Sequence, residues 1–143
     1  MNIQIVQTSQ EKQDAFSVRS TVFIKEQGVP EHIELDQYDD EAIHFICYAA
    51  SKEPIAAGRV RFLDNAGKLE RICVIKELRG NAIGADLIKQ MENAIQAEGK
   101  PLAKLHAQTH ATKFYKRLGY HVTSKPFMDA GIEHVAMEKT LTS

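Results

Sequence analysis

The alternation of apolar and polar positions predicts a chain of short strands interrupted by helices. Ile3 and Ile5 indicate a first strand, and Ser9 can cap a helix that runs to about Lys25. The expected buried stripe of this helix consists of Phe16, Val18, Val22 and Phe23. Apolar segments over 43–50 and 55–63 predict two strands joined by a turn. A turn over 64–67 then leads into a further strand, which gives an antiparallel meander.

A strand, a glycine-bearing turn and a helix follow one another between residues 69 and 97. The run over 69–75 is apolar and partly β-branched, and Gly80 and Gly84 follow it. The helical spacing comes from Ile83, Leu87, Ile88, Met91 and Ile95. Such a turn directs unpaired backbone N–H groups and the positive helix end toward one point, which suits a phosphate. Alternatively, the two glycines only let the helix start close to the sheet.

The last third of the chain predicts strand–helix units that cross over the sheet. We expect a strand over 102–108, a helix capped by Thr109 and ending at Gly119, and two final strands over 120–123 and 134–139. The segment 124–133 reads as irregular. Together with the meander, this order predicts a mixed α/β sheet in one domain over residues 1–143.

Charge and cysteine usage narrow the function classes. Eighteen basic and nineteen acidic residues leave a net charge of −1, so nothing favours nucleic acid or a membrane surface as partner. Cys47 and Cys73 lie in apolar runs without metal-ligand spacing, which predicts buried, reduced thiols. His106 and His110 are four residues apart, but a strand–helix boundary separates them, so we expect no metal site. Without a leader or spanning segment, a cytoplasmic protein is expected.

Two blocks of this sequence resemble motifs of the GNAT acyltransferase superfamily. The stretch LERICVIKELRGNAIGADLI is similar to its acetyl-CoA motif, whose turn is usually Q/R-x-x-G-x-G/A. Arg79 fills the first position and Gly84 the last, whereas Ala82 replaces the usual first glycine. The stretch ATKFYKRLGY is similar to the later A-x-x-F-Y-x-x-x-G-F/Y helix, and the likeness runs from about Ile3 to Leu141.

The resemblance implies a GNAT acyl-CoA acyltransferase fold, a mixed and mostly antiparallel sheet with splayed central strands and flanking helices. The splayed strands would be 68–75 and 102–108, with the pantetheine arm of the cofactor in the opening. It further implies a monomeric or homodimeric acetyl-CoA-dependent N-acetyltransferase that acts by direct transfer in a ternary complex. The acceptor would be a primary amine of a small metabolite: an amino acid, an amino sugar or a polyamine.

Three alternatives to this function stay open. The first is a protein N-terminus or lysine as the acceptor. The second is a GNAT-fold module that binds acyl-CoA as a sensor without turnover, which Ala82 favours and the pair Glu70 and Tyr115 opposes. The third is a Rossmann-type nucleotide binder, which would need parallel βαβ units before the motif rather than hairpin-linked strands.

Two residues are candidates for the chemistry. Family members commonly use a tyrosine at the position of Tyr115 as the general acid, and core packing is the alternative. Glu70 is the candidate base, because strand alternation places it with Ile72 and Val74. Apolar neighbours would raise the pKa of its carboxyl group toward a useful value. An ion pair with Arg71 or Arg59 is the alternative for Glu70.

The remaining expected site residues fall into two groups. Contacts to the cofactor are expected from Ile72, Cys73, Val74, Arg79, Gly80, Asn81, Ala82, Ile83, Gly84, Ala85, Phe114 and Arg117. The blocks VRSTVFIKEQGVP, ELD, LHAQ and FMDAGIEHVAM resemble a small bacterial GNAT subgroup. They and the strand over 43–50 carry the expected acceptor-binding residues, which are Glu26, Gln27, His44, His106, Gln108 and His134. A buried polar network is the alternative for the histidines and Gln108. The acidic segment 27–40 is either solvated or a rim that attracts a cationic substrate.

Overall fold

The computed structural model describes residues 1–141, and the last two residues of the predicted domain, 142–143, lie outside the described residues. The described chain forms an eight-stranded sheet in the order β1-β2-β3-β4-β5-β8-β6, with β7 also paired to β8. The strands are β1 (Asn2–Ile5), β2 (Ile43–Tyr48), β3 (Pro54–Phe62), β4 (Ala66–Val74), β5 (Leu102–Gln108), β6 (His121–Val122), β7 (Phe127–Asp129) and β8 (Ile132–Thr140). Pairing is antiparallel except between β4 and β5, so the predicted mixed sheet is confirmed.

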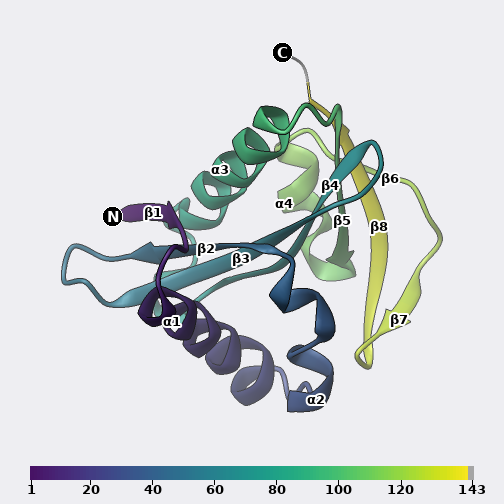
Figure 1. The fold of residues 1–143 in the computed structure, drawn as a ribbon. Helices are drawn as coiled ribbons and strands as arrows, with labels where there is room; N and C mark the ends of the chain where they lie inside the picture. Colours follow the sequence, from purple (N-terminus) through teal and green to yellow (C-terminus); the bar gives the residue numbers. More distant parts are fainter. Residues whose placement is uncertain (142–143) are drawn as a thin grey trace.

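Helices cover both faces of the sheet (Figure 1). They are α1 (Ser9–Arg19), η1 (Ser20–Glu26), α2 (Glu31–Glu34), η2 (Gln37–Asp40), η3 (Lys76–Leu78), α3 (Ile83–Ala97), η4 (Thr109–Ala111) and α4 (Thr112–Arg117). Helix α3 packs on β2, β3, β4 and β5 and covers the larger apolar core, which includes Leu69, Leu87, Met91 and Ile95. Helix α1 lies on the other face over a smaller core that includes Val18, Val22, Ile46 and Cys73.

The first helix differs from its prediction at both ends. Thr8 rather than Ser9 is the N-cap, and its side chain and that of Glu11 form a reciprocal capping box. After Arg19 the backbone widens into the π-helix η1, so the predicted helix to Lys25 is two elements. The predicted stripe is correct for its two valines, whereas its two phenylalanines are only partly buried.

An extra residue in β4 forms a β-bulge. Arg59 pairs with Glu70 and Ala57 pairs with Cys73, so two residues of β4 lie opposite the single Gly58 of β3. One of the two is Arg71, whose φ of 56° lies in the left-handed region. Because of the bulge, Glu70 shares a sheet face with Cys73, and Val74 lies on the opposite one. The predicted common face of Glu70 and Val74 is therefore wrong.

The two central strands separate partway along their length. The β4–β5 ladder joins 66–69 to 102–105 and stops there. Beyond Leu69 and Leu105 each strand keeps only its outer neighbour, β3 or β8. This confirms the splay that the family resemblance implied. Since β1 to β4 are antiparallel, the Rossmann alternative is wrong.

The segment predicted as irregular contains a strand. Residues 127–129 pair with 132–134 of β8 across a two-residue turn at Ala130 and Gly131, whose φ values are 53° and 77°. The predicted cap of the late helix is also wrong, because Ala111 holds the N-cap position of α4 and Thr109 lies in η4. The prediction that Cys47 and Cys73 are buried is confirmed.

Candidate active site

A cavity of about 700 Å³ occupies the opening between the separated ends of β4 and β5. Its walls come from β4, β5, the start of α3, η4, α4, the η1–α2 segment and the β7–β8 hairpin. The predicted site residues that line it are Gln27, Glu70, Ile72, Cys73, Val74, Arg79, Gly80, Ala82, Ile83, Gly84, Ala85, His106, Gln108, Phe114, Tyr115, Arg117 and His134. The fold thus brings most of the predicted residues to one place.

One end of the cavity is formed by the turn before α3. Ala82 is the N-cap of α3 and has a left-handed backbone, with φ 63° and ψ 8°. The N–H groups of Ile83, Gly84 and Ala85 lie in the first helical turn, where no helix carbonyl precedes them as a partner. They and the positive end of a 15-residue helix suit an anion at this position.

Arg79 connects this turn to the end of η1. Its Nη1 and Nη2 atoms lie 2.6 and 2.7 Å from the two carboxylate oxygens of Glu26, and its Nε donates to the carbonyl oxygen of Val74 at 2.9 Å. A phosphate at Arg79 would compete with Glu26 for these donors. Glu26 itself lies outside the cavity lining, as does Asn81, whose side chain donates to the Leu78 carbonyl oxygen.

Tyr115 on α4 combines a packed ring with a hydroxyl that has no hydrogen-bond partner in residues 1–141. Its ring makes edge contacts with Phe114 and Tyr120, with centroid distances of 5.1 and 6.0 Å. Burial raises the pKa of Tyr115 to about 12, so the hydroxyl keeps its proton at neutral pH. Gly84 lies close to the neighbouring Phe114 ring, since a Cβ built at Gly84 would lie 3.4 Å from Cζ of Phe114.

Glu70 is an ion-paired carboxylate, contrary to the predicted raised pKa. Its partners are Arg59 at 2.9 Å, Arg61 at 2.8 Å and Lys68 at 3.0 Å. Burial alone would raise the pKa of Glu70, but these three cations outweigh burial and lower it to about 2. The alternative of an ion pair with Arg59 is confirmed. Arg71, the other suggested partner, instead contacts α2.

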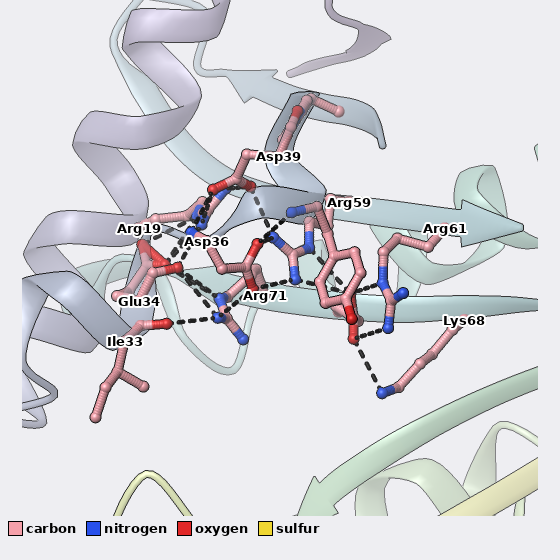
Figure 2. A network of polar contacts seen from close by, with 12 residues as sticks. Arg19, Ile33, Glu34, Asp36, Asp39, Arg59, Arg61, Lys68 and Arg71 are labelled. Atoms are coloured by element: carbon pink, nitrogen blue, oxygen red, sulfur yellow. Dashed lines mark hydrogen bonds and ion pairs between the residues drawn. The ribbon is translucent and has the colours of Figure 1, made fainter. Parts of the chain in front are cut away.

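The three cations around Glu70 belong to a larger buried network, drawn in Figure 2. Arg19 binds Glu34 and Asp39, each at 2.7 Å, and Arg59 binds Asp36 and Asp39, each at 2.7 Å. Burial would raise the pKa of Asp39, yet Arg19 and Arg59 lower it to about 2. Three carboxylates of the acidic segment are thus neutralised inside the protein, so the alternative of a solvated acidic segment is wrong for these three.

The predicted acceptor residues separate into two sets. Gln27 and Gln108 both line the cavity and join across it, since Nε2 of Gln108 donates to Oε1 of Gln27 at 3.0 Å. His106 and His134 both contact Phe127, the first edge-on with ring centroids 5.0 Å apart and the second stacked at 6.2 Å. Burial lowers the pKa of His106, and nearby Lys68 lowers it further. All four residues line the same cavity.

His44 does not line the cavity. It is 6% exposed on β2, and its Nε2 lies 2.8 Å from the carbonyl oxygen of Asp39. Its Nδ1 has no hydrogen-bond partner within the described residues. Burial lowers the pKa of His44, so the ring is neutral at pH 7. His44 is therefore buried away from the cavity wall, which agrees with the buried alternative, and one of its two ring nitrogens is hydrogen-bonded in residues 1–141.

Four charged residues of the cavity wall escaped prediction, namely Glu34, Lys68, Arg71 and Asp129. Arg71 reaches the wall because of the bulge, and a single inserted residue leaves no periodic signal in the sequence. Lysine and glutamate usually lie at the protein surface, so the residue types of Lys68 and Glu34 gave no sign of a place in the cavity wall. For Lys68 the signal was its place at the start of the strand predicted to splay.

Two features are absent from the described residues. Among residues 1–141 no three histidine, cysteine or acidic side chains cluster so that they could hold a metal ion. None of the described helices combines the length and the apolar character needed to cross a membrane.

Comparison with known proteins agrees with this architecture. Residues 6–141 match the family model of the acetyltransferase (GNAT) domain. The chain is 44% identical over 140 residues to YjcF, an uncharacterized N-acetyltransferase of Bacillus subtilis (strain 168), with 97% of this chain and 99% of YjcF covered. A crystal structure assigned as an N-acetyltransferase from Lactobacillus plantarum superposes with a TM-score of 0.92 at 27% identity, covering 99% and 98% of the two chains.

A more distant structure shares the fold and holds a ligand. It is an aminoglycoside 6'-N-acetyltransferase complexed with coenzyme A, with a TM-score of 0.75, 15% identity, and coverage of 98% of this chain and 97% of that one. The splayed strands and the helix end at the cavity agree with the family match over nearly the whole chain. The chain therefore belongs to the GNAT family of N-acetyltransferases, enzymes that use acetyl-CoA.

Proposed function

We propose that this enzyme moves the acetyl group of acetyl-CoA directly to a primary amine of a small metabolite within a ternary complex. The observation that carries the proposal is a continuous cavity between β4 and β5, whose wall includes both the first turn of α3 and the side chains of Gln27, His106, Gln108 and His134. The pyrophosphate would bind the free N–H groups of 83–85, and the pantetheine arm would lie along 72–74. Phe114 and Arg117 would contact the nucleotide side of the cofactor.

Tyr115 would act as the general acid. Its hydroxyl stays protonated at neutral pH because burial raises its pKa to about 12, so the proton is present when the sulfur leaves. As the tetrahedral intermediate collapses, the carbon–sulfur bond breaks and the leaving sulfur receives a proton. A hydroxyl with no other partner in residues 1–141 is free to supply it.

The incoming ammonium must lose a proton before it attacks, and His106 is the group that we propose to accept it. Burial lowers the pKa of His106, so its ring is neutral at pH 7. Neither ring nitrogen hydrogen-bonds to another described residue, and the ring lies in the cavity wall. Glu70 is a weak base by comparison, because three cations hold its pKa at about 2.

Two measurements test this function. Calorimetry should detect coenzyme A binding, and release of coenzyme A should be followed with acetyl-CoA against a panel of small amines, lysine peptides and peptides with free N-termini. We expect binding and turnover with at least one small amine. No binding would contradict the whole proposal. Binding without turnover on any acceptor would favour an acyl-CoA sensor, and turnover only on peptides would favour a protein N-acetyltransferase.

A further inference from the structure

The charged side chains beside the cavity carry an excess of positive charge. The network of Figure 2 contains five cations and four anions, joined by ion pairs of 3.2 Å or less. The cations are Arg19, Arg59, Arg61, Lys68 and Arg71, and the anions are Glu34, Asp36, Asp39 and Glu70. The carboxylates that the acidic segment contributes to this network are therefore all paired with cations and do not form a free acidic rim.

Two of the five cations line the cavity and keep hydrogen-bond donors that the network does not use. Arg71 binds Glu34 and Asp36 and the Ile33 and Glu34 carbonyl oxygens through Nε and Nη2 alone, and its Nη1 has no partner among the described residues. Lys68 has three donors, and Nζ makes one contact, to Glu70 at 3.0 Å. Their side chains are 24% and 18% exposed, so both reach solvent in the wall.

The carboxylates of the cavity wall differ in whether they are paired with cations. Glu34 is 2% exposed and pairs with Arg19 and Arg71, and Glu70 pairs with three cations. Asp129 on the β7–β8 hairpin is exposed and pairs with no cation in the described chain. Spare cationic donors and one free carboxylate match a ligand with both an anionic and a cationic group. They do not match a polyamine.

We propose that the acceptor is a primary amine that also carries a carboxylate or a phosphate monoester, which binds Nζ of Lys68 and Nη1 of Arg71. This assignment rests on the proposed acetyl transfer to a small amine. Both side chains would add charge-assisted hydrogen bonds to the anionic group. The backbone of Arg71 fits this role, because the left-handed φ of 56° is unfavourable for arginine and places its side chain in the network beside the cavity.

The test compares matched acceptors that differ only in the anionic group. One pair is an amino acid and its carboxamide, and another is a hexosamine 6-phosphate and the free hexosamine. A diamine is measured as a further acceptor. We expect kcat/KM to be about 10- to 100-fold higher for the anionic member of at least one pair, the range for a hydrogen bond to a charged group. Which pair responds distinguishes a carboxylate from a phosphate.

Variants then test the two side chains. Lys68→Gln should raise KM for the anionic amine about tenfold or more and leave the KM of its neutral counterpart nearly unchanged. Arg61→Gln is the matched control, since Arg61 also binds Glu70 but stacks on Tyr38, 3.8 Å from the ring centroid, outside the cavity lining. Arg71→Gln should show the same selective loss as Lys68→Gln, and Arg71→Lys, which retains the charge, should recover part of it.

Each outcome decides between the claims. If neutral amines or the diamine are better acceptors, or if Lys68→Gln and Arg61→Gln have equal effects, the anionic acceptor is wrong and the acetyltransferase stands. If no amine of any kind is acetylated, the proposed function fails and this assignment fails with it. Should Arg71→Gln not fold, Lys68→Gln with a thermal melt carries the test alone.

Discussion

At the scale of single residues, removal of the Tyr115 hydroxyl separates the proposed catalytic role of this residue from its packing role. Tyr115→Phe keeps the ring contacts to Phe114 and Tyr120 and leaves no buried group unpaired, so folding and coenzyme A binding should survive. If the hydroxyl protonates the thiolate, kcat should fall by roughly 10- to 1000-fold. Steady-state kinetics measures the change in kcat, and calorimetry measures coenzyme A binding. An unchanged kcat would reduce Tyr115 to a packing residue.

A second residue-scale prediction separates the proton acceptor from the ion pair. His106→Gln should lower kcat/KM at neutral pH and recover in part at higher pH, where free amine becomes abundant. Glu70→Gln should keep the shape of the pH–rate profile and instead lower the free energy of unfolding by roughly 3 kcal/mol, because Arg59, Arg61 and Lys68 lose a charged partner. The measurement is a pH–rate profile and a urea titration for each variant. Opposite behaviour of the two variants would restore Glu70 as the base.

At the scale of elements, the start of α3 departs from the family motif at Ala82, and this alanine has an unfavourable backbone conformation. Ala82 has φ 63°, where a Cβ costs roughly 1 kcal/mol and glycine costs nothing. Ala82→Gly should therefore raise the free energy of unfolding by up to about 1 kcal/mol, measured by urea titration, and leave coenzyme A affinity equal or tighter. A clear loss of affinity in calorimetry would mean that the loop follows a path different from the family's.

A substitution at the other glycine position of the motif, Gly84, should have the opposite effect on coenzyme A affinity. Gly84→Val adds a branched side chain where even a Cβ would lie 3.4 Å from Cζ of Phe114. The added methyl groups must move the ring or enter the space above the free N–H groups. Coenzyme A affinity should fall, while Ala82→Gly serves as the matched control in the same calorimetry. Wild-type affinity in Gly84→Val would remove the turn from the cofactor site.

Local signals explain which elements the sequence could predict. The strands predicted over 43–50 and 102–108 come from short apolar segments and helix α3 from helical periodicity, and the structure has all three within a residue or two of the predicted ends. β7 escaped because its three residues are mostly exposed and show no alternation between buried and exposed positions. The π-helical widening at Ser20 and the bulge at Arg71 also leave no pattern, because each depends on the neighbours packed against it.

At the scale of the whole molecule, the site could be predicted where one motif supplied it and not where distant segments meet. The loop over 79–85 and Tyr115 come from contiguous blocks, and all but one of these residues line the cavity. The pKa of Glu70, by contrast, depends on Arg59 and Arg61 from the neighbouring strand. The apolar neighbours within the strand predicted a raised pKa for Glu70. The pKa is instead lowered, because the pairing of β3 with β4 places Arg59 and Arg61 beside the carboxylate, and this register cannot be read from one sequence.

The buried ion-pair network also makes the stability of the molecule depend on acid pH. The pKa of Asp39 and that of Glu70 are each lowered to about 2 in the folded protein, against ordinary values of 3.8 and 4.5. A carboxyl group with a depressed folded pKa contributes its full stabilisation above the unfolded pKa and loses it as pH falls toward the folded pKa. The stabilisation is therefore present at pH 5 and above and is lost between about pH 4.5 and 2.

We expect the free energy of unfolding to fall a little between pH 7 and 5, because the lowered pKa values of His44 and His106 favour the unfolded chain once its histidines take up protons. It should then fall by several kcal/mol before pH 2, since each unit of pKa shift corresponds to about 1.4 kcal/mol. Urea titrations at closely spaced pH values measure this directly. Glu70→Gln should flatten part of the fall, because it removes one of the two groups, whereas Glu53→Gln, at an exposed turn position, should not. A stability that stays level from pH 5 to 3 in the wild-type protein would mean that the arginines do not hold these carboxylates in solution.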